Sequence, residues 1–181
     1  PAPQPTVDPT PAPTPDPAPQ PRTGQWKSGY FGWWYSYSDG TYAANETLVI
    51  DGQTYRFDAS GYLKMGWVYD GGHWYYHGSS GAQQYGWIMD RGSWYYLHAN
   101  GVMAIGWVQV DGSWYYLKAS GAMATGWVNL GGTWYYLTES GQMAIGWVKD
   151  GGSWYFCHPS GAMATGRVFY GGPAYTFDGS G

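Results

Sequence analysis

The sequence has few of the residues that mark enzymes, disulfide-stabilised folds and nucleic-acid-binding proteins. Only 11% of its 181 residues are charged, its net charge is −4, and it contains one cysteine. A single cysteine excludes an intramolecular disulfide, so packing must stabilise the fold. The slightly acidic balance provides no basic patch for phosphate groups, which argues against nucleic-acid binding. No apolar run is long enough for a membrane-spanning helix, so we predict no membrane span.

Residues that could form a catalytic or metal site are equally scarce. The histidines show no metal-ligand spacing, and no serine or cysteine is paired with a positioned histidine and acid. These histidines are His73, His77, His98 and His158. We therefore predict no catalytic residue, no metal and no cofactor, and expect any catalytic domain to lie outside this chain.

Proline is almost confined to the N-terminal end. Ten of the twelve prolines lie between Pro1 and Arg22, interleaved with Ala, Gln, Thr and Asp. This composition predicts an extended, semi-rigid polyproline II linker over residues 1–23. Because the sequence shows neither an initiator methionine nor a signal peptide, we expect a fragment or processed product that followed another domain.

Aromatic residues and glycine are abundant instead, and they recur with a fixed period. Aromatic residues make up 20% of the chain, which also has 30 glycines. A Gly-Trp pair recurs every 20 residues, and a second tryptophan, which opens a Trp-Tyr-aromatic triplet, follows each first one after seven residues. The first tryptophans of the intact units are Trp67, Trp87, Trp107, Trp127 and Trp147, and the second are Trp74, Trp94, Trp114, Trp134 and Trp154. Such a period indicates a repeat protein.

Each repeat is predicted to be one β-hairpin. Between Trp107 and Leu117, two aromatic and β-branched runs flank Asp111-Gly112, a strong hairpin-turn signal. A lone hairpin is marginal in water, so the units must stack. We predict an all-β module of seven or eight hairpins over residues 24–181, with its best repeats at about 66–165.

Alternation along the strands divides the repeat into two faces. Trp114 and Tyr116 share one face, while Tyr115 and Leu117 point the other way. Cys157 takes the place of that leucine in its own repeat and is predicted to be a small core residue. The predicted core face consists of Val68, Ile88, Val108, Val128 and Val148 with Tyr75, Tyr95, Tyr115, Tyr135 and Tyr155.

The terminal repeats lose their tryptophans but keep hairpin features. Thr47 and Thr54 replace both tryptophans of one early unit, although Asp51-Gly52 preserves its turn. The last unit has Arg167, Ala174 and Thr176 at the equivalent positions. Atypical ends are expected of a capped array. Since these hairpins persist without the tryptophan pair, we expect the pair to serve a ligand.

Paired indoles with a third ring from the next repeat would form three sides of an aromatic box. A quaternary ammonium has no N–H to donate and is attracted to ring faces, each contributing about 0.5–2 kcal/mol. Three rings together would contribute on the order of 2–5 kcal/mol, so each single site would bind its ligand weakly. The overall affinity would rise by avidity on a surface that carries many ligands.

The Gly-Trp pair, the Trp-Tyr-Tyr triplet and the following Gly-x-Met closely resemble the choline-binding repeats of bacterial cell-wall proteins. The resemblance covers roughly Gly24 to Gly181. It implies a left-handed β-solenoid that binds phosphocholine of teichoic or lipoteichoic acid between consecutive hairpins. It further implies a secreted protein at the bacterial cell surface, with terminal hairpins that dimerise in some members.

The resemblance also implies that each site combines two tryptophans, an aromatic residue of the next repeat and a methionine. The four sets are Trp67, Trp74, Tyr96 and Met103; Trp87, Trp94, Tyr116 and Met123; Trp107, Trp114, Tyr136 and Met143; and Trp127, Trp134, Phe156 and Met163. Two further pairs are expected to bind weakly or not at all. Trp147 and Trp154 would meet Thr176, and Trp26 and Trp33 would meet Arg56 and Leu63.

Two alternatives remain open at the level of the sequence. Glucan-binding repeats stack sugar rings on similar aromatic residues, although sugar sites usually add polar side chains that these walls lack. A structural spacer rod would need no ligand, and its sign would be burial of Trp67-type rings in the free protein.

Overall fold

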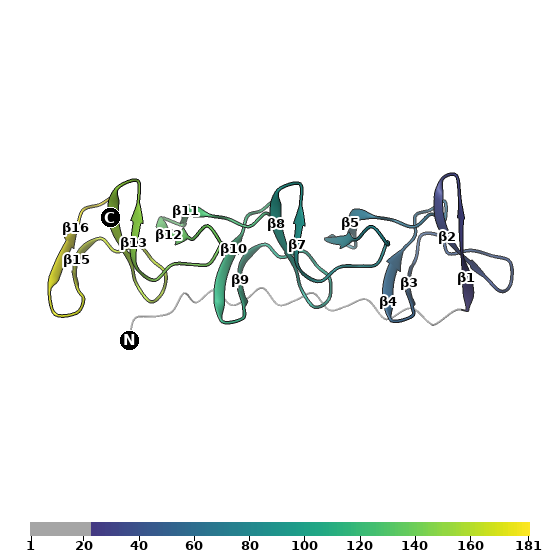
Figure 1. Cartoon of the computed structure of the whole chain (residues 1–181), viewed down its shortest axis with the longest axis horizontal. Coiled ribbons are helices and arrows are strands. Elements are labelled where there is room, and N and C mark those ends of the chain that lie inside the picture. The colour runs from purple at the N-terminus through teal and green to yellow at the C-terminus, as the bar shows by residue number, and fades with distance from the viewer. Residues whose placement is uncertain (1–22) are drawn as a thin grey trace. The chain divides into compact units, whose positions relative to one another are not determined.

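The computed structural model describes residues 23–181, so the linker predicted over 1–23 lies outside the described residues except for Thr23. The described chain contains sixteen strands, paired into eight two-stranded antiparallel sheets, and no helix (Figure 1). The prediction of an all-β array of tandem hairpins is confirmed. Within 23–181, no helix of membrane-spanning length and hydropathy occurs.

The described residues fall into two compact units, 23–104 and Ile105–Gly181, each with four hairpins. The first unit contains β1 (Gly24–Gly29), β2 (Gly32–Tyr37), β3 (Thr47–Ile50), β4 (Gln53–Arg56), β5 (Gly66–Asp70), β6 (His73–His77), β7 (Gly86–Asp90) and β8 (Ser93–Leu97). The second contains β9 (Gly106–Val110), β10 (Ser113–Leu117), β11 (Gly126–Leu130), β12 (Thr133–Leu137), β13 (Gly146–Asp150), β14 (Ser153–Cys157), β15 (Gly166–Phe169) and β16 (Ala174–Phe177).

The hairpin turns have the geometry that their residues favour. At Asp111-Gly112, for example, φ is +48° and +79°, and Arg91-Gly92 shows +48° and +79°. Two successive positive φ values define a type I′ turn, whose twist matches that of the flanking strands. Glycine adopts this conformation without strain, which explains why it occupies the second turn position throughout the central repeats.

The strand register confirms the predicted division into faces. Trp67 pairs with Tyr76 and Tyr69 pairs with Trp74, so both tryptophans of a hairpin lie on one face. Val68 pairs with Tyr75 on the opposite face. The same pairing occurs in β9 and β10, where Trp107 faces Tyr116 and Val108 faces Tyr115.

The most deeply buried residues form a column at the end of each hairpin's second strand. Leu117, Leu137 and Cys157 are fully buried there, and the buried residues Phe57, His77, Leu97 and Phe177 occupy the same position in four other repeats. Cys157 is therefore a core residue, as predicted, and burial raises the pKa of its thiol to about 11.

The predicted core face is only partly buried. Val68, Val108 and Val148 are buried, whereas Ile88 and Val128 are half-buried. The predicted core tyrosines, Tyr75, Tyr95, Tyr115, Tyr135 and Tyr155, are likewise half-buried. Three tyrosines of this face, Tyr95, Tyr135 and Tyr155, also contact the first tryptophan of the preceding hairpin.

Candidate functional site

The two tryptophans of a hairpin stand perpendicular to each other. The ring centroids of Trp67 and Trp74 are 6.5 Å apart with planes at 85°. Trp107 and Trp114 are separated by 6.4 Å at 90°. The pairing register places the second tryptophan diagonally across from the first on the same face, so the indoles meet at an angle. Two perpendicular ring faces form a corner against which a compact cation can pack.

A third ring reaches this corner from the following hairpin. The centroid of Tyr95 lies 4.8 Å from that of Trp67. Three equivalent contacts lie in the second unit: Trp107 with Tyr135 at 5.1 Å, Trp127 with Tyr155 at 4.8 Å, and Trp147 with Tyr175 at 4.8 Å. Tyr95, Tyr135 and Tyr155 directly follow the second tryptophan of their own hairpin, and Tyr175 follows Ala174, which stands in that tryptophan's place. Three of them were predicted from the sequence as core residues, and no contact between them and the tryptophans was predicted.

The aromatic residues predicted as third walls pack within their own hairpins. Each lies directly across from the first tryptophan in the strand register. The centroid distances are 5.1 Å for Tyr96 to Trp87, 5.2 Å for Tyr116 to Trp107, 5.0 Å for Tyr136 to Trp127 and 5.2 Å for Phe156 to Trp147. They therefore support the first tryptophan of their own repeat, and their role in the preceding repeat's site stays a prediction.

The methionines adjoin the tryptophan pairs through the backbone. The amide of Met103 donates a 2.8 Å hydrogen bond to the carbonyl of Trp74. Met143 and Trp114 are joined in the same way at 2.7 Å, and Met163 and Trp134 at 2.8 Å. Each methionine follows the next hairpin, so the connector folds back onto the tryptophan strand. The set Trp87, Trp94, Tyr116 and Met123 is divided between the two units and stays a prediction.

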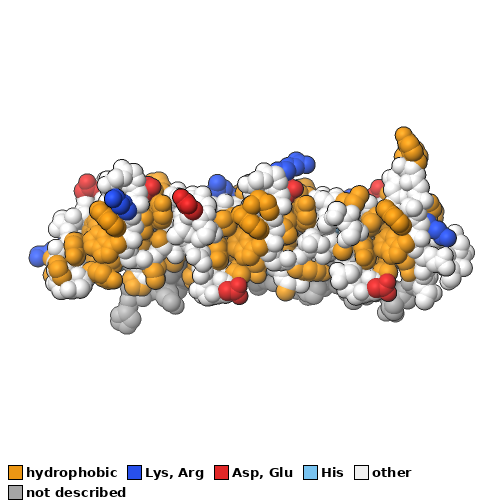
Figure 2. All heavy atoms as spheres, in the orientation of Figure 1, with side chains coloured by type: hydrophobic (Ala, Val, Ile, Leu, Met, Phe, Trp, Pro, Cys, Tyr) orange, Lys and Arg blue, Asp and Glu red, His pale blue; other side chains and the backbone are white. Residues whose placement is uncertain are grey.

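The outer rings of the corners are accessible to solvent. Trp74 is 43% exposed and Trp134 is 42% exposed. Their partners Trp67 and Trp127 are half-buried. On the face drawn in Figure 2, hydrophobic side chains lie open at the surface while charged ones are scattered. Burial of these rings, the sign expected of a spacer rod, is not observed.

The two atypical pairs differ from each other. Trp147 and Trp154 lie 6.3 Å apart at 89°, and Tyr175 supplies the ring expected to be missing at Thr176. Trp26 instead packs into a small core, where its centroid lies 4.9 Å from Tyr55 and 5.8 Å from Phe57. The corner at Trp147 therefore resembles the intact ones, whereas the half-buried Trp26 packs against a core cluster.

Carboxylates supplement two of the corners. The indole Nε1–H of Trp67 donates a 3.1 Å hydrogen bond to Asp90, and that of Trp127 donates one of 3.1 Å to Asp150. Among the described residues, no group of three or more His, Cys, Asp or Glu side chains is arranged to hold a metal ion. The arrangement of open aromatic corners with a carboxylate at the edge suits an organic cation.

Comparisons with known proteins agree with this geometry. A sequence profile described as "Choline-binding repeat" matches residues 64–105 and 104–145, and one described as "Putative cell wall binding repeat" matches 145–163. The chain belongs to the choline-binding repeat family. A choline-binding repeat module is a non-catalytic binding domain, and here it is built as a β-solenoid of tandem hairpins. A search of curated protein sequences finds no match.

Solved structures of Streptococcus pneumoniae proteins share this architecture. CbpJ is 36% identical over 83% of this chain and 55% of its own length, with a TM-score of 0.78. Choline binding protein F is 37% identical over 88% and 56%, also with a TM-score of 0.78, and it has been solved in complex with ipratropium. The choline-binding domain of CbpL is 33% identical over 79% and 78%, with a TM-score of 0.62. The chain thus spans little more than half the length of CbpJ and choline binding protein F.

Proposed function

We propose that this choline-binding repeat module mediates attachment to the bacterial cell wall by binding the choline groups of teichoic or lipoteichoic acid. The observation that carries the proposal is the three-ring corner, in which Trp67 and Trp74 of one hairpin meet Tyr95 of the next. The trimethylammonium group of choline is attracted to ring faces and cannot form N–H hydrogen bonds, so such a corner suits it.

The proposed sites are the corners begun by Trp67, Trp87, Trp107 and Trp127, together with that begun by Trp147. The two tryptophans provide the walls, and a methionine of the following connector lies behind the corners begun by Trp67, Trp107 and Trp127. The third wall is either the tyrosine that contacts the first tryptophan, such as Tyr95, or the residue predicted from the sequence, such as Tyr96. Parallel substitution of these two residues distinguishes the assignments.

Several weak sites on one module suit a polymer that displays many ligands. Each corner is expected to bind choline in about the millimolar range, since three ring contacts contribute on the order of 2–5 kcal/mol. Simultaneous engagement of neighbouring sites raises the overall affinity without a new contact. The complex of choline binding protein F with ipratropium, a quaternary ammonium compound, supports this choice of ligand. In this proposal the module contributes attachment and has no catalytic activity of its own.

Titration of tryptophan fluorescence tests the proposal. Choline is compared with 3,3-dimethylbutan-1-ol, its uncharged isostere, and with glucan oligomers. We expect a saturable change with choline in the millimolar range and a much weaker response to the isostere, because only choline is a cation. A response to glucan alone would move the function to polysaccharide binding.

Substitution of the tryptophans provides a second test of the proposed function. The variant combining Trp107→Ala, Trp114→Ala, Trp127→Ala and Trp134→Ala should lose the corresponding sites. The matched control is Trp34→Ala, because Trp34 pairs with Lys27 and lies on the face of its hairpin opposite Trp26 and Trp33. Wild-type affinity in the fourfold variant, with the fold retained, would contradict the proposal.

A further inference from the structure

In three repeats, the residue that ends the first strand of the hairpin contacts the preceding hairpin. In the central repeats this position holds an acid or an apolar residue at intervals of 20: Asp70, Asp90, Val110, Leu130 and Asp150. The repeats are otherwise nearly uniform in their aromatic residues. A position that is charged in some repeats and aliphatic in others can therefore distinguish the sites from one another.

Two of these acids bind an indole of the preceding hairpin in the same way. Asp90 Oδ2 accepts from Trp67 Nε1 and Asp150 Oδ2 accepts from Trp127 Nε1, both at 3.1 Å and both across 23 residues. The two contacts lie in different units but have the same spacing and distance, so this hydrogen bond is a property of the repeat. A carboxylate that accepts the indole N–H orients the ring and adds negative charge at its edge.

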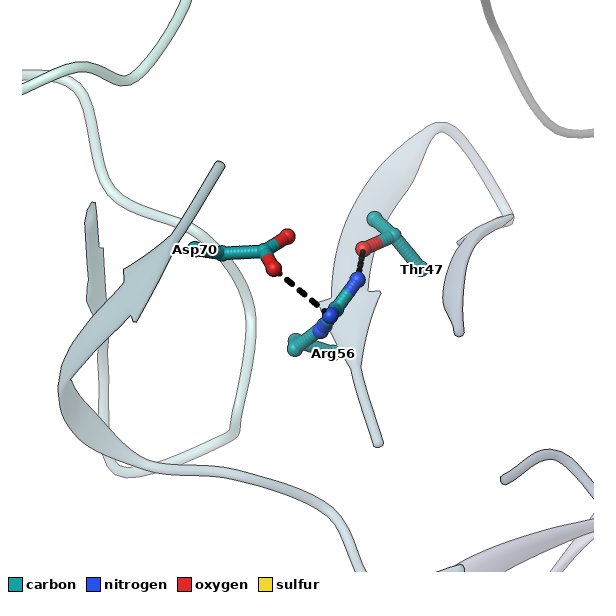
Figure 3. Close-up of polar contacts among 3 residues, drawn as sticks. All are labelled: Thr47, Arg56 and Asp70. Carbon is teal, nitrogen blue, oxygen red and sulfur yellow. Dashed lines mark hydrogen bonds and ion pairs between the residues drawn. The ribbon is translucent and has the colours of Figure 1, made fainter. Parts of the chain in front are cut away.

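The third acid of the set binds a cation. Asp70 Oδ1 lies 2.8 Å from the Arg56 guanidinium, whose other terminal nitrogen donates a 2.9 Å hydrogen bond to Thr47 Oγ1 (Figure 3). Thr47 occupies the position of Trp67, and Arg56 occupies that of Tyr76. Where the tryptophans are lost, a cation of the chain itself thus lies between the hairpins and against this acid.

We propose that the carboxylates of Asp90 and Asp150 create two acidic cation sites that favour choline over phosphocholine, whereas the site of Trp107 and Trp114 lacks this preference. The inference rests on the proposed function. Leu130 stands at the acid's position in that third site, so no carboxylate adjoins its first indole there. The arrangement of Arg56 and Asp70 shows that an acid at this position reaches a cation held by the preceding hairpin.

The ligand preference follows from charge. Choline carries one positive charge, whereas phosphocholine adds a phosphate that a nearby carboxylate repels. Charges closer together than the screening length of about 8 Å at physiological salt are only partly screened. Arg91 Nε lies 3.9 Å from Asp90 Oδ2, but the Arg91 side chain is 92% exposed, so it competes only weakly for that carboxylate.

The test compares choline and phosphocholine in a variant that combines Asp90→Asn and Asp150→Asn. Asparagine retains an oxygen that can accept the indole N–H but removes the charge. Indole N–H resonances in ¹H–¹⁵N NMR spectra report each tryptophan separately. At the Trp67 and Trp127 sites we expect choline affinity to fall about two- to fivefold, the range of a partly exposed charge pair, with phosphocholine affinity unchanged or higher. The Trp107 site serves as an internal reference.

Two further variants complete the test. Asp111→Asn removes a turn carboxylate that is exposed and should leave all ratios unchanged. Leu130→Asp adds the missing carboxylate and should raise the ratio of choline to phosphocholine affinity at the Trp107 site, a result that does not depend on folding of the asparagine variant. Ratios equal to wild type in both the double asparagine variant and Leu130→Asp would overturn the inference alone. Absence of binding by either ligand to the wild type would instead overturn the proposed function.

Discussion

Tyr95 packs its ring 4.8 Å from that of Trp67, although the two residues belong to different hairpins. The contact joins the tryptophan face of one hairpin to the opposite face of the next. Because the same contact recurs at Trp107, Trp127 and Trp147, the surface that stacks the hairpins also builds the corners that face solvent. Stacking and ligand binding therefore depend on the same tyrosines.

A first prediction concerns the third wall of the Trp67 site. Tyr95→Leu should weaken choline binding at that site by about 0.5–2 kcal/mol, the contribution of one ring. Tyr96→Leu is the matched control, since Tyr96 packs on Trp87 within its own hairpin. NMR titration of the Trp67 indole resonance measures the change. If Tyr96→Leu weakens this site and Tyr95→Leu does not, the third wall is the residue predicted from the sequence.

A second prediction concerns the corner at Trp147. Tyr175 completes three rings there, so we expect this corner to bind choline although Thr176 is not aromatic. Tyr175→Ala should reduce the number of occupied sites in a calorimetric titration, and Thr176→Ala should leave that number unchanged. A stoichiometry that stays the same in Trp147→Ala would argue that this corner is unused.

A third prediction concerns His77, which replaces leucine in the buried column. Its Nδ1–H donates a 2.8 Å hydrogen bond to the carbonyl of Gly81. Burial lowers the pKa of His77 below its ordinary value of 6.5; the bond to Gly81 opposes this shift, and the positive charges of Arg56 and Lys64 add to it. The unfolded chain therefore binds a proton more readily, so stability present above pH 6.5 is lost as the pH falls below that value.

His77→Leu introduces the residue of the following repeats and should remove this part of the pH dependence. Urea unfolding at pH 7.5 and 5.5 measures the free energy of unfolding. His73→Ser, which introduces the residue found at the same position of the next two repeats, is the control and should keep the wild-type loss at low pH. An equal loss in His77→Leu and wild type would exclude His77 as its source.

A fourth prediction uses two glycines of similar conformation. Gly161 and Gly166 have φ of +82° and +72°, so alanine is strained at both, at a cost of about 1–2 kcal/mol. A Cβ at Gly161 would overlap the Met143 sulfur, whereas one at Gly166 would meet nothing. Gly161→Ala should therefore lower the free energy of unfolding by a further 1–3 kcal/mol or so, because the new methyl group overpacks the site. Thermal unfolding checks the order of the two variants.

Gly161→Ala should also weaken choline binding at the Trp107 site. Met143 must move away from the new methyl group, and its backbone is bonded to Trp114. Gly166→Ala should leave that site intact. Equal melting temperatures for the two variants would show that the methionine side chain adapts without cost.

The repeat sequence alone determined the hairpins, their turns and their two faces. These features depend on local rules: side chains alternate along a strand, and residues such as Asp111-Gly112 favour a type I′ turn. The fully buried position of Cys157 could also be predicted, because the residue takes the place of a leucine in a periodic pattern. The loss of the tryptophan pair from the terminal hairpins indicated that the pair serves a ligand, and the family resemblance then grouped each pair with a third ring and a methionine.

Contacts between hairpins were decided only by the tertiary structure. Alternation shows which side of a strand carries Tyr95, but the rotation and offset between neighbouring hairpins determine that this ring meets Trp67. The same holds for Asp90, whose carboxylate accepts a hydrogen bond from Trp67, and for Arg56, which pairs with Asp70 of the next hairpin. Such pairs are 14 to 28 residues apart, and no local preference of the chain specifies their meeting.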